Sequence, residues 1–201
     1  MGDIEFIKSK IKIIPDFPQK GIMFQASAFL ANCAKLQDIF PVFQDPLAVE
    51  ALITHIVGHI IEKFGNSVDV IVGLDARGFL LGPVIALRLG AAFVPVRKRG
   101  KLPGETTEVA YVKEYGTDYF EMQKGACKEG QKVIVIDDLI ATGYNFAKFH
   151  NLSRGSAKAA GDLIKGNNAR VLEYIFFVEL CALGGSAKLD APTYSLIKDQ
   201  S

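Results

Sequence analysis

Two adjacent carboxylates, Asp137 and Asp138, lie in the middle of the segment VIVIDDLIATG at residues 133–143. The apolar run before them is typical of a strand buried on both faces, and we expect the pair to mark where this strand reaches the surface. Small residues follow, and GSAKAAGDLIK at 155–165 is predicted to be a helix. Backbone N–H groups and a helix N-terminus can hold a phosphate, while carboxylates accept hydrogen bonds from ribose hydroxyls or face a hydrated Mg²⁺. The pattern predicts a site for a phosphorylated sugar; the alternative is a buried strand that ends in two solvated acids.

A second candidate segment, DARGF at 75–79, follows the predicted strand VDVIVGL at 68–74. Open α/β sheets bind ligands at the carboxyl ends of their parallel strands, so this turn lies where a ligand is expected. The planar guanidinium of Arg77 can hold a diphosphate, and Gly78 permits a close approach of the backbone. A surface ion pair is the alternative role of Arg77.

Four cations lie close together in the segment RKRGKLPG at residues 97–104. Such a cluster is usually a solvated surface and less often a nucleic-acid patch. The chain is almost neutral, at +1, and no aromatic residues alternate with these cations. We therefore expect no nucleic-acid binding and interpret the segment as a mobile lid over a small polyphosphate.

The composition indicates one soluble globular domain. A chain of 201 residues, 49% of them hydrophobic, can bury a sizeable core. The N-terminal segment lacks the apolar run of a signal peptide, and no segment approaches the ~18–20 apolar residues of a membrane span. The 3 cysteines are widely spaced, which predicts reduced thiols rather than a disulfide framework or zinc site. We expect a cytoplasmic protein that does not bind membranes.

Hydrophobic periodicity and turn residues predict the elements that would position these groups. Helices are expected at 4–14, 45–64, 79–89 and 155–165, and strands at 68–74, 92–96, 107–113, 119–122, 133–136 and 171–180, the last being the final strand. Alternating strands and helices predict a mostly parallel, doubly wound α/β sheet, with a hairpin-like flap at 107–122. His55 and His59 lie four residues apart outside the apolar arc of their helix, and we expect a solvated helix face rather than a metal site.

The ordered motifs resemble those of the type I phosphoribosyltransferases. The series DD-x-x-ATG at 137–143 resembles their phosphoribosyl-diphosphate signature, and GLDARGF at 73–79 resembles their diphosphate-binding loop. The segments RKRGKLPGE at 97–105 and DFPQKGIMF at 16–24 are similar to those of members that act on adenine. The resemblance implies a Rossmann-like sheet with an N-terminal hood and a flexible lid loop, a homodimer, and a cis peptide bond after the acid of the DARGF loop.

The implied reaction transfers the 5-phosphoribosyl group of phosphoribosyl diphosphate to adenine, which gives AMP and diphosphate in purine salvage. Mg²⁺ is the implied cofactor. No direct protein ligand is expected for the metal, which would be held by diphosphate and ribose, with its water shell near Asp137 and Asp138.

The resemblance also implies a role for each matched residue. Glu114 is the expected acid/base at the purine, Asp138 the carboxylate that stabilises charge on the ribose, and Arg77 a catalytic cation at the diphosphate. The expected substrate contacts are Asp137 and Asp138 at the ribose hydroxyls; Ala141, Thr142, Gly143, Gly155 and Ser156 at the 5′-phosphate; Asp75, Arg77, Arg97 and Lys101 at the diphosphate; and Met23, Phe24, Gln25 and Tyr115 around the base.

Two segments, 26–37 and 144–154, interrupt the resemblance. Without them the flanking residues join as GIMFQ-DIFPVFQDP and DDLIATG-GSAKAAGDLIK, the uninterrupted patterns of the family. We interpret both as insertions in a single phosphoribosyltransferase domain at 1–201, and as translated introns rather than natural loops. Two alternative functions stay open: a catalytically impaired homologue that binds nucleotide or phosphoribosyl diphosphate as a regulator, and a phosphoribosyltransferase for another purine base.

Overall fold

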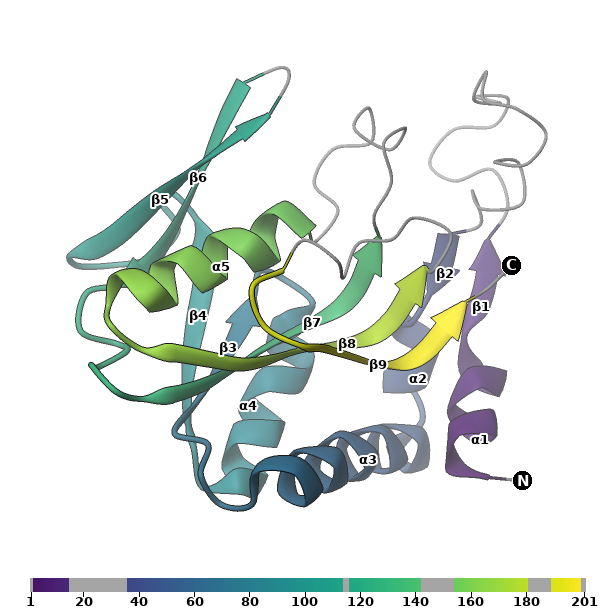
Figure 1. Ribbon diagram of the computed structural model, residues 1–201. Helices are drawn as coiled ribbons and strands as arrows, with labels where there is room; N and C mark the ends of the chain where they lie inside the picture. The colour runs from purple at the N-terminus through teal and green to yellow at the C-terminus, as the bar shows by residue number, and fades with distance from the viewer. Residues whose placement is uncertain (1, 15–35, 114–115, 142–153, 181–188, 200–201) are drawn as a thin grey trace.

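The computed structural model describes residues 2–14, 36–113, 116–141, 154–180 and 189–199. Its centre is a seven-stranded sheet with the strand order β5-β6-β4-β3-β7-β8-β9 (Figure 1). The strands are β3 (Val70–Leu74), β4 (Ala92–Lys98), β5 (Thr106–Lys113), β6 (Gly116–Gln123), β7 (Lys132–Ala141), β8 (Arg170–Leu180) and β9 (Thr193–Asp199). All of them are parallel except β5 and β6, which form an antiparallel hairpin at one edge. The predicted mostly parallel sheet is confirmed.

Helices cover both faces of this sheet, as a doubly wound arrangement requires (Figure 1). α3 (Pro46–Phe64) and α4 (Gly78–Leu89) pack on one face, and α5 (Arg154–Gly166) packs on the other. The N-terminal part adds α1 (Asp3–Lys10), α2 (Phe40–Phe43) and a two-stranded sheet of β1 (Lys12–Ile14) and β2 (Leu36–Asp38). No helix in the described ranges is both long and apolar enough to span a membrane.

α3 begins where the sequence predicts. Asp45 is its N-cap, because its carboxylate accepts the N–H of Leu47 at 3.0 Å, and Pro46 occupies the first helical turn. The apolar arc of the helix is buried in the core through Leu52, Ile53, Ile56, Val57 and Ile60. Burial of this arc attaches α3 to the sheet.

β7 continues past the acid pair. Its pairing with β3 ends at Ile136 opposite Gly73, but its pairing with β8 continues to Ala141 opposite Leu180. Asp137 is only 6% exposed and Asp138 only 2%. The expectation that the strand surfaces at this pair is therefore wrong, because β8 is long enough to provide backbone partners well beyond the end of β3.

Two element boundaries also differ from the expectation. The helix expected at 4–14 ends at Lys10, and Lys12–Ile14 forms β1 because β2 supplies an antiparallel partner. β8 is not the final strand, since β9 follows it and pairs with it in parallel from Tyr174 to Leu180. Both differences arise from strand partners that are distant in the sequence and leave no local periodic signal.

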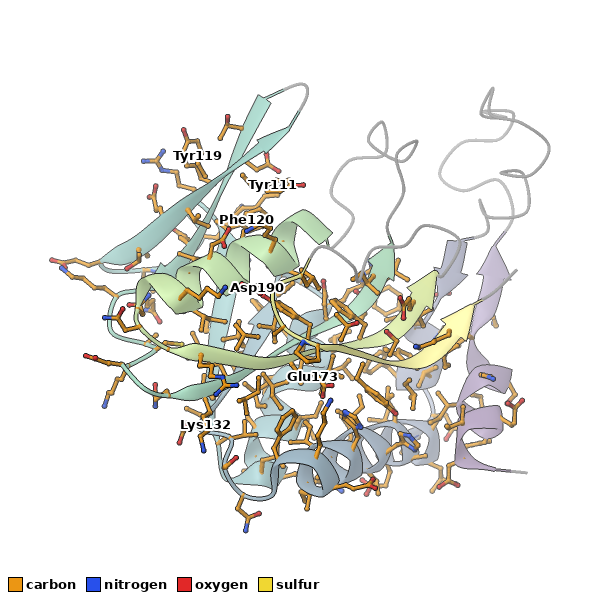
Figure 2. The ribbon with its side chains drawn as sticks, viewed as in Figure 1. Tyr111, Tyr119, Phe120, Lys132, Glu173 and Asp190 are labelled. Carbon is orange, nitrogen blue, oxygen red and sulfur yellow. The ribbon has the colours of Figure 1, made fainter. Side chains whose placement is uncertain are left out.

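His55 and His59 do not form a solvated helix face. His55 Nε2 lies 3.0 Å from the hydroxyl of Tyr194, and His59 Nε2 lies 2.8 Å from Glu173 Oε2. The His59 ring also stacks on Tyr194, with 3.6 Å between ring centroids. Glu173, on β8, faces α3 across the sheet surface (Figure 2). Helical periodicity did not indicate these partners because they come from β8 and β9.

Gly78 opens α4 directly against β7. A Cβ at this position would lie 2.6 Å from the carbonyl oxygen of Ile136. The close approach predicted at Gly78 is thus made to the strand that carries the acid pair, and glycine allows the first turn of α4 to reach it.

Replacement of Gly78 by alanine is expected to destabilise the protein by ~1–3 kcal/mol, because the added methyl must move α4 away from a backbone carbonyl. The matched control is Gly58→Ala in α3, where no atom beyond the neighbouring residues and the backbone of the helix itself lies within 4 Å of the added methyl. In a helix interior alanine is favoured over glycine by ~0.5–1 kcal/mol, so the control should gain stability. Urea unfolding measures both changes, and a Gly78→Ala protein as stable as wild type would contradict the packing argument.

Candidate active site

Asp137 and Asp138 lie where the ladder between β3 and β7 ends. The Asp138 N–H donates to Asp137 Oδ1 at 3.0 Å. Arg77, which follows β3, places Nε 3.0 Å from Asp138 Oδ2. This contact has the distance of an ion pair but lacks the geometry of a hydrogen bond, so Asp138 Oδ2 has no hydrogen-bond partner among the described residues. A buried carboxylate oxygen without a donor is costly in the free protein and can accept a hydrogen bond from a ligand.

Burial of two adjacent carboxyl groups disfavours the doubly ionised pair. Removal from water raises the pKa of Asp137 well above its ordinary value of 3.8, and the charge of Asp138 raises it further. Burial also raises the pKa of Asp138, but the Arg77 guanidinium opposes this rise. Asp138 is therefore the more readily ionised member of the pair.

The loop after β3 brings another acid to the basic segment. The peptide bond between Asp75 and Ala76 is cis, as the resemblance implied. Asp75 Oδ2 accepts a hydrogen bond from Arg97 Nε at 2.9 Å, and Arg97 Nη1 donates to the carbonyl of Lys101 at 3.1 Å. In this conformation Asp75 orients Arg97, and a direct contact of Asp75 with substrate stays a prediction.

The basic loop, residues 97–105, has a defined conformation in which its backbone is anchored. The N–H groups of Lys101 and Leu102 donate to Glu121 Oε1 at 2.8 and 2.7 Å. Gly100 and Gly104 turn the chain with φ angles of 79° and 80°, in the left-handed region that favours glycine. Lys101 itself is exposed, so its ammonium group is accessible to an anion.

The expected phosphate loop is described only at its two ends. β7 ends at Ala141 and α5 begins at Arg154, so Gly155 and Ser156 lie in the first turn of a helix that packs against β7. A Cβ on Gly155 would lie 2.4 Å from the ring of Tyr111, which accounts for glycine there. The N-terminus of a helix offers free N–H groups to a phosphate.

The other predicted site residues lie outside the described part of the chain. They are Glu114 and Tyr115 in the flap, Thr142 and Gly143 in the phosphate loop, and Met23, Phe24 and Gln25 in the hood. The flap is bounded by described strands, since β5 and β6 pair up to Lys113 opposite Gly116. The two insertions lie outside as well, apart from Leu36 and Gln37 in β2 and Arg154 in α5.

The sequence does not single out Glu121 as a functional residue. It lies between Phe120 and Met122 on β6, and alternation along a strand predicts that an acid between two apolar residues faces solvent. All three are buried, with Glu121 only 2% exposed. No local signal indicates this, because the basic loop that contacts Glu121 arrives from a different part of the sequence.

Comparison with known proteins agrees with this geometry. Residues 43–146 match the family described as the phosphoribosyl transferase domain. An adenine phosphoribosyltransferase of Yarrowia lipolytica is 50% identical over 195 residues, which cover 96% of this chain and 94% of the relative.

Solved structures match over a similar extent. The crystal structure of the Saccharomyces cerevisiae adenine phosphoribosyltransferase, in complex with an imino-altritol bisphosphate and adenine, has a TM-score of 0.80 and 42% identity, and the match covers 96% of this chain and 98% of that chain. The enzyme from Thermoanaerobacter pseudethanolicus has a TM-score of 0.79 and 41% identity, with coverage of 98% and 99%. Since the matched residues 43–146 include the DARGF loop, the basic loop and the acid pair, the chain belongs to the adenine phosphoribosyltransferases of the type I phosphoribosyltransferase family.

Proposed function

We propose that this chain transfers the 5-phosphoribosyl group of phosphoribosyl diphosphate to adenine, giving AMP and diphosphate in purine salvage. The observation that carries the proposal is the buried acid pair, in which Asp138 Oδ2 lacks a donor among the described residues. Ribose hydroxyl groups are donors that would satisfy such an oxygen. As the bond between the anomeric carbon and diphosphate breaks, positive charge develops on the ribose ring, and a carboxylate fixed nearby stabilises it.

Cations from two loops would receive the leaving diphosphate. Arg77 follows β3, and Arg97 and Lys101 flank the turn of the basic loop. Neutralising charge on the diphosphate makes it a better leaving group, and a guanidinium can bind it through two hydrogen bonds. The 5′-phosphate would bind the N–H groups at Ala141–Gly143 and in the first turn of α5.

Mg²⁺ is the proposed cofactor, and the acid pair fits it chemically. Carboxylate oxygens are ligands that Mg²⁺ prefers, and the ion usually keeps several waters while binding substrate phosphates. Asp137 and Asp138 would therefore face its water shell. When bound, the ion neutralises negative charge on the diphosphate.

The base would be held by residues outside the described part of the chain. Glu114 is the proposed acid/base at the purine, with Tyr115 beside it, and Met23, Phe24 and Gln25 would surround adenine. The family resemblance supports these roles, and it also supports a cytoplasmic location. A panel of purine bases separates adenine from hypoxanthine or xanthine as the preferred substrate.

A catalytically impaired binding protein is the second candidate function. It is favoured by the segment 144–154, which follows β7 in the expected phosphate loop and ends at Arg154, the first residue of α5. Longer loops cost little closure entropy, so the fold tolerates such a segment. The segment separates the N–H donors of the first turn of α5 from the acid pair, and catalysis requires these donors and the acid pair at the same substrate in the transition state.

We further propose a homodimer, as the resemblance implies. Three apolar residues follow one another on α4 at helical spacing: Leu80, Val84 and Leu87, which are 41%, 40% and 81% exposed. An exposed apolar stripe of this kind is typical of a protein–protein contact.

Formation of AMP from labelled adenine, phosphoribosyl diphosphate and Mg²⁺ tests the function in the full chain and in a chain without residues 26–37 and 144–154. The shortened chain is expected to be at least ~100-fold more active, because a displaced donor at a developing charge typically costs 100- to 1000-fold. Asp138→Asn in the shortened chain should lose activity by a similar factor.

Equal activity of the two chains would show that the segments are tolerated surface loops and would remove the support for an impaired protein. No activity in either chain would contradict the proposed function. Transcripts that contain both segments would contradict their interpretation as introns.

Asp137→Asn is expected to stabilise the protein at neutral pH. Because the folded-state pKa of Asp137 lies above 3.8, wild type loses stability as the pH rises from 3.8 through the folded-state value, and asparagine cannot ionise. Thermal unfolding should therefore show a smaller decline with pH for the variant, each kcal/mol corresponding to about 2–4 °C in Tm. Asp162→Asn is the control, since Asp162 forms a surface pair with Lys158 and such pairs contribute little to stability. Parallel profiles for Asp137→Asn and wild type would contradict the pKa argument.

The dimer is tested by light scattering of the full chain. Leu87→Glu is expected to give a monomer, because it places a charge on the most exposed residue of the apolar stripe. The matched control is Leu47→Glu, at a residue that is 74% exposed on α3 and is not part of the α4 stripe, and it should stay dimeric. A monomeric wild-type chain would refute the proposal.

A further inference from the structure

The anchor of the basic loop is a buried acid outside the predicted site. Glu121 Oε1 accepts the N–H groups of Lys101 at 2.8 Å and Leu102 at 2.7 Å, and Oε2 accepts the Thr106 hydroxyl at 3.2 Å. The side chain is only 2% exposed. The residue extends from β6, the strand of the hairpin that pairs with β4 (Figure 1).

A buried carboxylate is unfavourable unless donors surround it, and here two backbone donors come from the basic loop and a third donor, Thr106, from the start of β5. Burial raises the pKa of Glu121, but the N–H groups of Leu102, Lys101 and Gly100 outweigh it and hold the pKa below its ordinary value. The carboxylate is thus ionised at neutral pH. Its charge and the backbone of residues 100–102 stabilise each other, so this conformation of the loop depends on Glu121.

The loop backbone that Glu121 holds also contacts Arg97, the other basic residue expected at the diphosphate. Arg97 lies directly opposite Glu121 in the ladder between β4 and β6. Its guanidinium donates to the carbonyl of Lys101 and to Asp75. If the backbone at Lys101 moved, Lys101 would shift relative to the DARGF loop, and Arg97 would lose one of its two partners.

We propose that Glu121 is a positioning residue for the diphosphate of phosphoribosyl diphosphate: it holds the basic loop so that Lys101 and Arg97 meet that group. The inference rests on the proposed function, in which these cations bind diphosphate. Glu121 does not touch the substrate and acts through the loop backbone.

The competing explanation is that Glu121 merely stabilises the hairpin. Glu108 offers a matched comparison, because it lies directly opposite Glu121 in the ladder between β5 and β6. Its carboxylate pairs with the exposed side chain of Arg99 in the basic loop at 3.1 Å, whereas the backbone N–H groups of Lys101 and Leu102 donate to Glu121. Loss of Glu108 should therefore free the Arg99 side chain and leave the backbone anchor at Lys101 and Leu102 in place.

The test compares Glu121→Ala, Glu121→Gln and Glu108→Ala in the full chain. Hydrogen exchange of the Lys101 and Leu102 amides should accelerate about tenfold or more in Glu121→Ala, because both lose their acceptor. Calorimetry with Mg²⁺ should show about tenfold weaker binding of phosphoribosyl diphosphate and an unchanged Kd for AMP, which lacks the diphosphate. Glu121→Gln keeps one acceptor oxygen, so its amide exchange and its Kd for phosphoribosyl diphosphate should be close to those of wild type. Glu108→Ala should match wild type in both measurements.

Equal weakening of phosphoribosyl diphosphate and AMP, unchanged amide exchange, or the same loss in Glu108→Ala would overturn the proposal. If the alanine variant does not fold, Glu121→Asp serves instead, because its side chain is one methylene shorter and withdraws the acceptor while keeping the charge. A wild-type chain that binds neither ligand would contradict the proposed function, whereas the exchange rates would still decide the role of Glu121.

Discussion

The structure depends on the burial of two adjacent carboxyl groups at the end of the ladder between β3 and β7. β7 continues to pair with β8 beyond the end of β3, so Asp137 and Asp138 stay inside the sheet. Gly78 allows the first turn of α4 to pack against Ile136, the residue just before them. Ions at such a position are unfavourable without partners. Arg77, in the loop after β3, supplies an ion-pair partner for Asp138. The hydrogen-bond donor that Asp138 Oδ2 still lacks among the described residues is left to a ligand.

Two buried acids, Glu121 and Asp138, differ in the hydrogen bonds that their carboxylates accept. Glu121 receives hydrogen bonds from loop N–H groups and a threonine hydroxyl, so its charge stabilises one loop conformation. Asp138 retains an oxygen without a donor among the described residues, so its charge lowers stability and favours ligand binding. A buried polar group without a partner needs an explanation, and for Asp138 a ligand that supplies the missing donor is one.

Much of the fold was predictable because its signals are local. The N-cap at Asp45, the apolar arc of α3 and the short buried strands each depend on residues close in sequence. The predicted order of strands and helices was enough for the mostly parallel sheet. The errors arose where a distant partner decides the outcome, as for β1, β9 and the contact of His59 with Glu173.

The sequence by itself determined the family and the candidate ligands, because motifs such as DARGF and DD-x-x-ATG carry their chemistry in residue type and spacing. Only the tertiary structure decided which charges are buried and which groups they contact. Burial depends on what packs above a side chain, and for Asp138 and Glu121 those groups come from other segments of the chain. The alternation of apolar and polar residues along one strand cannot encode such contacts, since it describes only the strand to which the residue belongs.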